Sequence, residues 1–363
     1  MKSSDLPAVV AIAVNNKGQR VDYTFGKAIW KEEASVTSKH IFRIFSMTKL
    51  MTTVAALQLV EQGKVKLDED LSSFLPEMAK IPILSGGKLV APKNPITLRQ
   101  LLTHTSGFGY TTTDEELAKF DRSTWQFKDL PRRFESGAQF LYGTSIDWAG
   151  RLVEKISGLT LENYFQKKIC GPLKMTRTWF NVPDSLKQFI VSRGDRGNDG
   201  LHPLTEIENR VPSKPTTEFS GGGGLFSSPE DFTKLLQCIL YNGQWGKYQI
   251  LEKPTVKEMF RNQIGNISMA DAGKYFTKGL CCNFDGITSA TTKWGFGGLI
   301  DNEGKSYGRK AETLLWGGLM NTYFYIDFKS GIAASIYTQH LPFNHPATTS
   351  LFTKFSESIY SVK

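Results

Sequence analysis

Between Ser46 and Gln62 the sequence is apolar at most positions, and this stretch limits the fold more than any other. Its length and composition predict a helix that ends at Gly63, since glycine is the residue most often found just past a helix end. A helix with so little polar face has to be surrounded by other elements, so we expect it at the centre of the protein. Its apolar positions are Leu50, Met51, Val54, Ala55, Ala56, Leu57, Leu59 and Val60.

The first turn of this helix carries a serine and a lysine, Ser46 and Lys49, three residues apart. Residues at this spacing lie on one face of a helix, and a hydroxyl and an amine are costly to bury without partners. The helix dipole and burial both disfavour the ammonium form of such a lysine. A neutral Lys49 could then accept the proton of Ser46 and make it a nucleophile. From this segment alone, a helix-capping serine beside a surface lysine is the alternative.

The pattern Ser-x-x-Lys is weak by itself, because the chain contains a second copy at Ser85-Gly86-Gly87-Lys88. Two glycines between the serine and the lysine indicate a flexible loop, so we expect no fixed geometry between these side chains. The meaning of the first copy therefore depends on the rest of the chain.

The composition is that of an ordinary globular protein of 363 residues with a net charge of +9. The basic residues are scattered, and no nucleic-acid-binding motif accompanies them, which favours a solvated basic surface over nucleic-acid binding. Attraction to anionic substrates or membrane surfaces stays open. No apolar run reaches the length of about 18 residues that a membrane span needs. The N-terminus lacks a signal peptide, so we expect an intracellular protein or one whose leader has been removed.

Cysteine and histidine spacings indicate neither a disulfide framework nor a metal site. The four cysteines have no C-x-x-C spacing and are expected to be buried free thiols. The five histidines form no metal-binding pattern, so we predict no metal and no cofactor. The cysteines are Cys170, Cys238, Cys281 and Cys282.

Strand patterns occur at both ends of the chain and helical patterns lie between them. Strand patterns at 7–14, 19–25, 322–328 and 332–338, with turn residues between neighbours, predict one antiparallel sheet built from both ends. A helix from about 347 to 360 follows. The expected class is α+β, with residues 1–75 and 216–363 forming a sheet domain, residues 76–215 a mostly helical domain, and the active site at their junction.

Shorter signals place the elements between the strands. Thr97 and Ser228 are expected helix caps, Gly158 a helix end and Thr160 the start of another helix. A long irregular stretch at 108–139 is typical of a functional loop. The run Ser220-Gly221-Gly222-Gly223-Gly224 is followed by no G-K-[ST], so it indicates close backbone packing rather than a phosphate loop.

Three motifs follow one another in a fixed order: Ser46-x-x-Lys49, Tyr142-Gly143-Thr144, and Trp316-Gly317-Gly318, which we expect to open a strand. In this order they resemble the serine β-lactamase and penicillin-binding superfamily, in its class C and family VIII carboxylesterase branch. The segment from Tyr142 to Gly150 is similar to lovastatin-type acyltransferases and their esterase relatives. The resemblance covers essentially the whole chain and implies the β-lactamase/transpeptidase-like fold.

The resemblance implies a role for each matching residue. Ser46 matches the nucleophile, Lys49 its proton acceptor, and Tyr142 the tyrosine that shares a proton with Lys49 and passes it to the leaving group. The backbone N–H groups of Ser46 and Leu319 match the oxyanion hole. His104, a tempting base, matches a structural turn.

Two departures from the class C pattern bear on the substrate. Thr144 stands where those enzymes have asparagine, and Trp316-Gly317-Gly318 replaces Lys-Thr-Gly. The loss of a lysine and a threonine that would hold a β-lactam carboxylate favours neutral acyl groups. Aromatic side chains that could line an acyl pocket or belong to the core are Tyr110, Trp125, Trp316, Tyr323 and Phe324.

The expected function is that of a serine hydrolase acting through an acyl-enzyme. A carboxylesterase for short-chain or aryl esters, with weak β-lactam hydrolysis as a side activity, fits the resemblance. Three alternatives stay open: an acyltransferase using the same acyl-enzyme, a D-amino-acid amidase or peptidase, and a non-catalytic penicillin-recognising scaffold. The expected partner is a small-molecule ester, without nucleic acid or membrane span, and the oligomeric state is left open.

Overall fold

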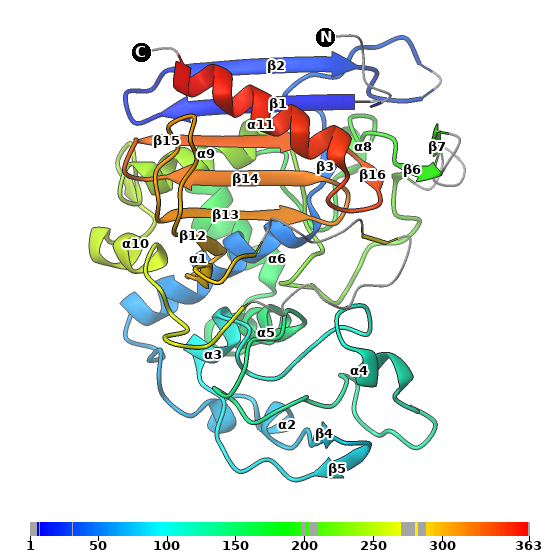
Figure 1. The fold of residues 1–363 in the computed structure, drawn as a ribbon, viewed down its shortest axis with the longest axis vertical. Coiled ribbons are helices and arrows are strands. Elements are labelled where there is room, and N and C mark those ends of the chain that lie inside the picture. Colours follow the sequence, from blue (N-terminus) through cyan, green and yellow to red (C-terminus); the bar gives the residue numbers. More distant parts are fainter. Residues whose placement is uncertain are drawn as a thin grey trace.

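The computed structural model describes residues 6, 8–30, 32–197, 200–203, 210–269, 280–281 and 288–361. Within these residues the largest sheet has seven strands in the order β11-β12-β13-β14-β15-β1-β2. Every neighbouring pair in it is antiparallel, and β1 from the N-terminus pairs with β15 from the C-terminal part, as Val10 opposite Tyr337 shows. The predicted sheet from both chain ends is therefore confirmed (Figure 1). Its strands are β1 (Ala8–Asn15), β2 (Arg20–Gly26), β11 (Lys293–Trp294), β12 (Leu299–Asp301), β13 (Thr313–Gly318), β14 (Thr322–Asp327) and β15 (Ile332–Tyr337).

Helices cover both faces of this sheet. Helix α11 (Pro346–Ser361) crosses the face turned toward the viewer in Figure 1 and contacts β1 and β15. Helix α9 (Pro229–Leu240) packs on the same two strands from behind. The sheet is therefore a middle layer, which explains why its inner strands are apolar on both faces.

Helix α1 (Thr48–Glu61) is the helix predicted from the apolar stretch, and it lies where that prediction placed it. All of its residues except Val60 and Glu61 are buried, and Gly63 beyond it has a φ of +66°, as a glycine past a helix end should. Helix α5 (Ser145–Ser157) packs against it from the loop-rich part in the lower half of Figure 1. Together α1 and α5 connect the two parts of the molecule.

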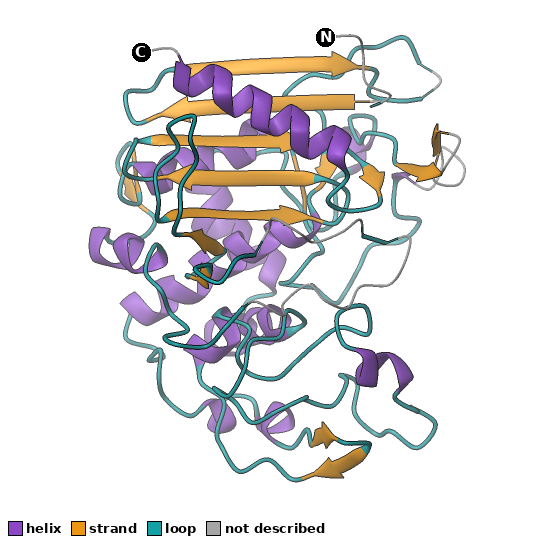
Figure 2. Ribbon diagram, viewed as in Figure 1, coloured by secondary structure: helices purple, strands orange, loops and turns teal. Residues whose placement is uncertain are grey.

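The remaining elements are short, and much of the lower half consists of loops, as Figure 2 shows. The region 108–139, expected to be irregular, contains one helix, α4, in which Asp114 caps the N-terminus. Strand β6 pairs with β16, so residues 194–197 lie beside a segment near the C-terminus. The domain division at residues 75 and 215 stays a prediction.

These short elements are β3 (Phe42–Arg43), β8 (Phe226–Ser227), α2 (Pro76–Ala79), β4 (Ile83–Ser85), β5 (Lys88–Val90), α3 (Leu98–Leu102), α4 (Glu115–Lys119), α6 (Leu161–Phe165), the π-helix Gln166–Cys170, α7 (Gly171–Leu173), α8 (Asp184–Lys187), β6 (Gly194–Gly197), β7 (Gly200–Pro203), β9 (Gln244–Trp245), β10 (Tyr248–Gln249), α10 (Lys253–Met259) and β16 (His340–Leu341), with 3-10 turns at Phe45–Met47 and Leu71–Ser73.

Helix ends follow their sequence signals closely. Thr97 forms a capping box with Gln100, and the Ser228 and Thr160 side chains each accept a hydrogen bond from a backbone N–H in the first turn of their helix. Gly158 ends α5 in the left-handed conformation, with a φ of +69°. The predictions made from caps are confirmed because these signals act within a few residues.

Two predictions about local structure are wrong. Gly86 and Gly87 form the tight turn of the β4–β5 hairpin, with φ of +56° and +74°, and Ser85 pairs directly with Lys88. This stretch is therefore an ordered hairpin and not a flexible loop, because two glycines with positive φ are what such a turn requires. Trp316-Gly317-Gly318 ends strand β13 instead of opening a strand.

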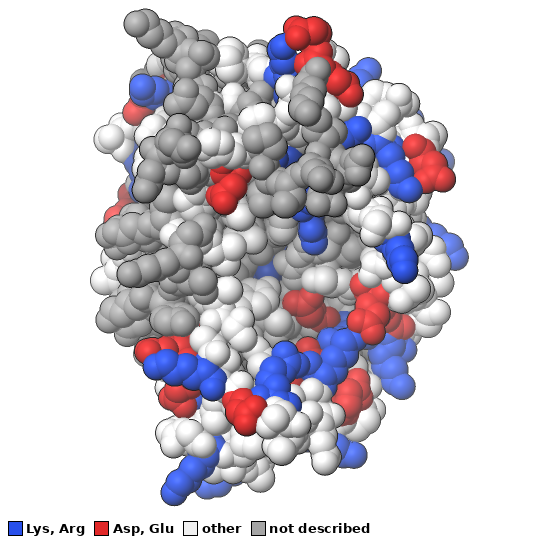
Figure 3. Space-filling model, turned by 90° about the vertical axis from the view of Figure 1, so that its right-hand side faces the viewer, with Lys and Arg blue, Asp and Glu red and all other residues white. Residues whose placement is uncertain are grey.

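Cys170 and Cys238 are buried and form no disulfide, as expected, whereas Cys281 is only partly buried and Cys282 lies outside the described residues. Within the described ranges, none of the helices is both long and apolar enough to cross a membrane. Figure 3 shows basic and acidic side chains interspersed over the lower half of the face that it presents.

Candidate active site

Ser46 lies in the 3-10 turn Phe45–Met47 that leads into α1. Phe45 has a φ of +44°, which costs a residue with a side chain about 1 kcal/mol or more and is typical of functional turns. The residue that caps α1 is Met47, and no side chain makes a cap hydrogen bond there. The alternative that Ser46 is a helix-capping serine beside a surface lysine is therefore wrong.

Lys49 is buried, with only 1% of its surface exposed, and its amine has three partners. Its Nζ donates to Ser46 Oγ at 3.1 Å, to the carbonyl oxygen of Gly222 at 2.6 Å and to Tyr110 Oη at 3.3 Å. An ammonium group has three N–H bonds, and a side-chain hydrogen bond with Tyr142 adds a further partner for Lys49. The site thus contains a cation with a complete set of acceptors.

The electrostatics of Lys49 differ from the sequence-based expectation. Burial lowers the pKa of Lys49, but Tyr110, Tyr142 and the Asp147 carboxylate raise it by more, so its pKa lies above the ordinary value. Burial also raises the pKa of Tyr110, against the opposing effect of Lys49. This direction is opposite to the expectation that burial and the helix dipole disfavour the ammonium form, because Asp147 and two tyrosines distant in the sequence surround the amine; the role of Lys49 as proton acceptor stays a prediction.

Tyr142 lies against the same amine. Lys49 Nζ is 4.7 Å from the centre of its ring, and Trp316 Nε1 donates a hydrogen bond of 3.0 Å to its hydroxyl oxygen. Trp316 is itself buried, with 6% of its surface exposed. The indole therefore supports Tyr142 from behind, and its N–H stabilises negative charge on the phenol oxygen.

His104 packs against the Tyr142 ring, with the ring centres 4.6 Å apart. It adopts a φ of +56° in a turn, and its Nδ1 accepts a hydrogen bond from the N–H of Gly143. Burial, followed by the Lys49 charge, holds the pKa of His104 well below its usual value. His104 is thus a neutral side chain in a turn that shapes the backbone beside Tyr142.

Ser46 opens into a cavity of about 740 Å³. The predicted residues Tyr110, Tyr142, Thr144 and Leu319 line it with Ser46, whereas Trp125, Trp316, Gly317 and Gly318 are not among its described lining residues. The other lining residues are Phe45, Thr112, Thr113, Lys128, Asp129, Asp147, Arg151, Glu154, Thr217, Glu218, Phe219, Ser220, Gly222, Gly223 and Leu280. The cavity therefore combines an aromatic side near Ser46 with a charged side.

Three predicted pocket residues have other surroundings. Trp125 packs between Phe120 and Phe127, with ring centres 5.1 and 4.9 Å away. Phe324 is buried against Phe232. Tyr323 lines a second cavity, described below.

The glycines of the third motif allow strand β13 to approach the chain just before Ser46. A Cβ on Gly318 would lie 2.2 Å from the carbonyl oxygen of Ile44, and one on Gly317 would lie 2.6 Å from the Tyr323 ring. This close packing brings Leu319 and Ser46 to the same cavity. A shared oxyanion site for their N–H groups is compatible with this placement and stays a prediction.

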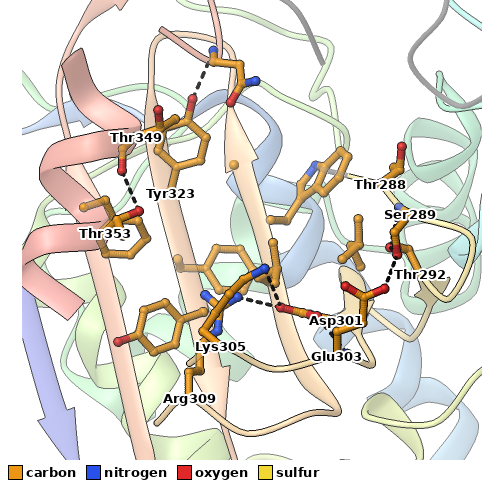
Figure 4. Close-up of a pocket in the computed structure, with 18 of the residues that line it drawn as sticks. Thr288, Ser289, Thr292, Asp301, Glu303, Lys305, Arg309, Tyr323, Thr349 and Thr353 are labelled. Carbon is orange, nitrogen blue, oxygen red and sulfur yellow. Dashed lines mark hydrogen bonds and ion pairs between the residues drawn. The ribbon is translucent and has the colours of Figure 1, made fainter. Parts of the chain in front are cut away.

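A second cavity, of about 470 Å³, is lined by residues of β13, β14 and α11 (Figure 4). Its charged groups pair with one another: Asp301 accepts from Arg309 at 2.7 Å and lies 3.6 Å from Lys305. Glu303 accepts from the hydroxyl of Ser289. Its lining includes the predicted residues Trp316, Gly317 and Phe324, so it adjoins the indole that bonds to Tyr142, whereas Ser46, Lys49 and Tyr142 are not among its lining residues.

Two contributors to the site were missed from the sequence. The Gly222 carbonyl is a partner of Lys49, although its glycine run was interpreted only as close packing. Asp147 bonds to the same run, and Tyr110 reaches Lys49 although it was expected only in the pocket. The glycine run and the position of Asp147 near Tyr142 were visible, but nothing local indicated that they meet at Lys49. In the described ranges, no cluster of three or more histidine, cysteine or acidic residues is suited to a metal ion.

Comparison with known proteins agrees with this geometry. The sequence profile of the Beta-lactamase family matches residues 1–351. Monacolin J acid methylbutanoyltransferase of Aspergillus terreus is 30% identical over 393 aligned positions, covering 99% of this chain and 93% of that protein. Lovastatin esterase of Penicillium rubens is 32% identical over 313 positions, covering 80% of this chain and 77% of that protein.

Solved structures show the same architecture. Simvastatin synthase from Aspergillus terreus, solved without ligand, superimposes with a TM-score of 0.85 at 28% identity, covering 99% of this chain and 95% of that one. EstCE1, described as a hydrolase with promiscuous acyltransferase activity, shares the fold with a TM-score of 0.75 at 21% identity, over 92% of this chain and 89% of that one. With its β-lactamase/transpeptidase-like fold and a family match over most of its length, the chain belongs to the beta-lactamase family.

Proposed function

We propose that this chain is a serine carboxylesterase that forms an acyl-enzyme on Ser46. The observation that carries the proposal is the contact of 3.1 Å between Ser46 Oγ and the buried Lys49 amine, at the wall of a cavity of about 740 Å³. A serine becomes a useful nucleophile when a neighbouring group can take its proton as it attacks.

The proton acceptor in the proposal is Tyr142, acting with Lys49. We propose that Tyr142 acts as the base once it has given up its own proton, with its oxygen accepting the Trp316 N–H and the Lys49 amine beside its ring. The Ser46 Oγ–C bond forms as the serine proton moves to Tyr142. The bond from that carbon to the alkoxy oxygen then breaks, and the leaving alcohol takes the proton from Tyr142.

Deacylation repeats these steps with water. Water gives its proton to Tyr142 while its oxygen attacks the acyl carbon, and Ser46 recovers a proton as the acid leaves. In both halves the N–H groups of Ser46 and Leu319 are proposed to bind the carbonyl oxygen as it becomes negative. Mutational losses of about 10²–10³-fold are typical when such a donor is removed.

The proposed substrates are short-chain or aryl esters with a neutral acyl group. The side chain from the third motif is an indole that bonds to Tyr142, and no lysine stands there to bind a substrate carboxylate. The aromatic side of the cavity near Ser46 suits an apolar acyl group. Weak β-lactam hydrolysis is the expected side activity, because it needs the same acyl-enzyme.

Acyl transfer to an alcohol is a second candidate. The relatives include an enzyme described as a methylbutanoyltransferase as well as one described as an esterase. Both outcomes use one acyl-enzyme and differ only in whether water or an alcohol removes the acyl group. Amide or peptide cleavage and a non-catalytic scaffold have no comparable observation in their favour.

One assay series tests the proposal: p-nitrophenyl esters of increasing chain length, nitrocefin, and an acyl thioester with and without an alcohol acceptor. We expect turnover of short esters, slow turnover of nitrocefin, and loss of ester turnover in Ser46→Ala. Faster consumption of the thioester with the alcohol, giving a new ester, would favour acyl transfer. Turnover of none of these substrates, together with no covalent adduct on Ser46, would contradict the proposal.

A further inference from the structure

The run of one serine and four glycines, Ser220–Gly224, forms a wall of the lysine site. Thr52 Oγ1 of α1 donates to the carbonyl oxygen of Gly221 at 2.7 Å, and Lys49 Nζ donates to that of Gly222 at 2.6 Å. On the other side, Gly222 N–H and Ser220 Oγ donate to one carboxylate oxygen of Asp147, at 3.1 and 2.6 Å. Gly222 therefore lies between the two charged groups: its N–H contacts the Asp147 carboxylate, and its carbonyl oxygen, in the next peptide group, contacts the Lys49 amine.

We propose that Asp147 is a positioning residue that holds the Gly222 carbonyl on Lys49 and keeps this amine charged through the reaction. The inference rests on the proposed function of Ser46 and deepens it. Asp147 acts through Gly222 and Lys49, and not by contact with the reacting carbon.

The packing of the glycine run supports this role. A Cβ on Gly222 would lie 2.4 Å from Asp147 Oδ2. A Cβ on Gly221 would lie 3.0 Å from the Ile146 carbonyl oxygen and 3.1 Å from Thr52 Cγ2. The peptide is thus held closely between α1 and α5, and glycine is needed for the carboxylate to reach its N–H.

The hydrogen bonds of Asp147 also distinguish this role from that of a helix-capping residue. Asp147 lies in the first turn of α5, where acidic residues often stabilise a helix through its dipole. Its carboxylate, however, bonds across to Gly222 and Ser220, which lie about 75 positions further along the chain. By holding the N–H of Gly222, the carboxylate fixes the orientation of this residue and with it the carbonyl that accepts from Lys49.

The charges around Lys49 come from several segments. Tyr110, Tyr142 and Asp147 raise the pKa of Lys49, while His104 is held neutral by burial and by this cation. Arg151, one turn beyond Asp147 on α5, pairs with Asp129 at 2.6 Å. Asp147 is therefore a carboxylate that raises the pKa of both Lys49 and Tyr110, and removing its charge should ease the loss of a proton from these two groups.

Two substitutions separate the charge of Asp147 from its hydrogen bonds. Asp147→Asn keeps an oxygen that can accept from Gly222 and Ser220 but removes the charge, so the pH profile of kcat/KM for a p-nitrophenyl ester should move to lower pH by about one unit. Asp147→Asn should also lower the plateau kcat by about threefold, because a neutral amide oxygen holds the Gly222 N–H more weakly than a carboxylate does. Asp147→Ala should show the same shift and a further loss of about tenfold in kcat, and Asp147→Glu should restore the profile partly.

A direct readout of Lys49 does not depend on turnover. Lysine labelled with ¹³C at Cε gives an NMR signal for Lys49, assigned by its loss in Lys49→Arg, and this signal should titrate at lower pH in Asp147→Asn. The matched control is Asp70→Asn, because Asp70 caps a 3-10 turn by accepting from Ser72 N–H. This control should change neither the profile nor the Lys49 titration.

Either readout can overturn the inference. If Asp147→Asn has the pH profile and Lys49 titration of the parent protein, Asp147 is only a structural residue. If the parent protein turns over no ester, the proposed esterase fails by itself, and the NMR titration alone decides whether Asp147 controls the charge of Lys49.

Discussion

The chain contains the same four-residue pattern twice, in two different settings. Ser46 and Lys49 lie at the start of a buried helix, and Ser85 and Lys88 face each other across an exposed hairpin. The spacing brings serine and lysine together in both places, because residues three apart are neighbours on a helix and across a two-residue turn. Proximity alone therefore does not separate a catalytic pair from a surface pair.

The two pairs differ in what surrounds them. Lys49 has acceptors from three separate segments, namely Ser46, Tyr110 and Gly222, and Asp147 lies behind the last of them. Ser85 and Lys88 are exposed, where solvent screens charge and nothing prevents either side chain from moving. We conclude that burial and long-range partners, rather than the pattern, give the first copy its chemistry.

The largest expected difference is between the two serines. Ser46→Ala should lower kcat/KM for a p-nitrophenyl ester by at least about 10⁴-fold, because no acyl-enzyme can form. Ser85→Ala should leave activity unchanged. Circular dichroism and thermal unfolding confirm that both variants fold, and equal losses in the two variants would remove the basis of the comparison.

The two lysines should differ by nearly as much. Lys49→Met removes the cation that stabilises charge on Tyr142, so we expect a loss of about 10²–10⁴-fold in kcat. Lys88→Met should match the parent protein in the same steady-state assay. If Lys49→Met kept most of its activity, the ammonium would have no part in proton transfer.

The two tyrosines near Lys49 should differ in how much each contributes to kcat. Tyr142→Phe removes the hydroxyl that accepts from Trp316 and should lower kcat by about 10²–10⁴-fold. Tyr110→Phe removes only one acceptor of Lys49, so a loss of about tenfold is expected. A larger loss in Tyr110→Phe than in Tyr142→Phe would reverse the proposed roles, and single-turnover kinetics would show it.

Near the first pair, stability should also depend on pH. The pKa of buried His104 lies well below its unfolded value of about 6.5, so the unfolded chain binds a proton that the folded chain excludes. The stabilisation that comes from excluding this proton is fully present above about pH 6.5. As the pH falls below this value, the free energy of unfolding decreases by at most about 1.4 kcal/mol per pH unit. Chemical unfolding of the parent protein and of His104→Asn at pH 7 and 5 measures this, and His104→Asn should lose less stability.

The smallest effect belongs to the hairpin copy. Gly87 has a φ of +74°, so Gly87→Ala should cost about 1–2 kcal/mol of unfolding free energy locally and leave kcat unchanged. In the glycine run that contacts Lys49, the comparable change Gly222→Ala should lower activity as well, because the new Cβ would meet Asp147. Ester hydrolysis measured beside thermal unfolding separates the two, and an activity loss in Gly87→Ala would contradict the comparison.

Much of the fold could be predicted because its signals are local or strongly periodic. The apolar helix α1, the strands at both ends, and the caps at Thr97, Thr160 and Ser228 all lie where the sequence placed them. The hairpin at Gly86-Gly87 was misread because a glycine pair is compatible with both a loose loop and a tight turn. The resemblance placed the third motif correctly in order but at the wrong end of its strand.

The site was harder to predict than the fold. The motifs indicated Ser46, Lys49 and Tyr142, and the structure brings all three together. The direction of the Lys49 pKa shift differs from the expectation because it depends on Tyr110, Tyr142 and Asp147, whose distance from the amine no local pattern gives. Trp125 was assigned to the pocket from its residue type, yet its neighbours are other aromatic side chains.

The central claim is that Ser46, and not Ser85, forms the acyl-enzyme, and mass spectrometry of the intact protein after treatment with an alkyl p-nitrophenyl phosphonate tests it most directly. We expect one adduct per chain, mapped by peptide digestion to Ser46, lost in Ser46→Ala and retained in Ser85→Ala. An adduct that persists in Ser46→Ala, or no adduct in a protein that hydrolyses esters, would contradict the account.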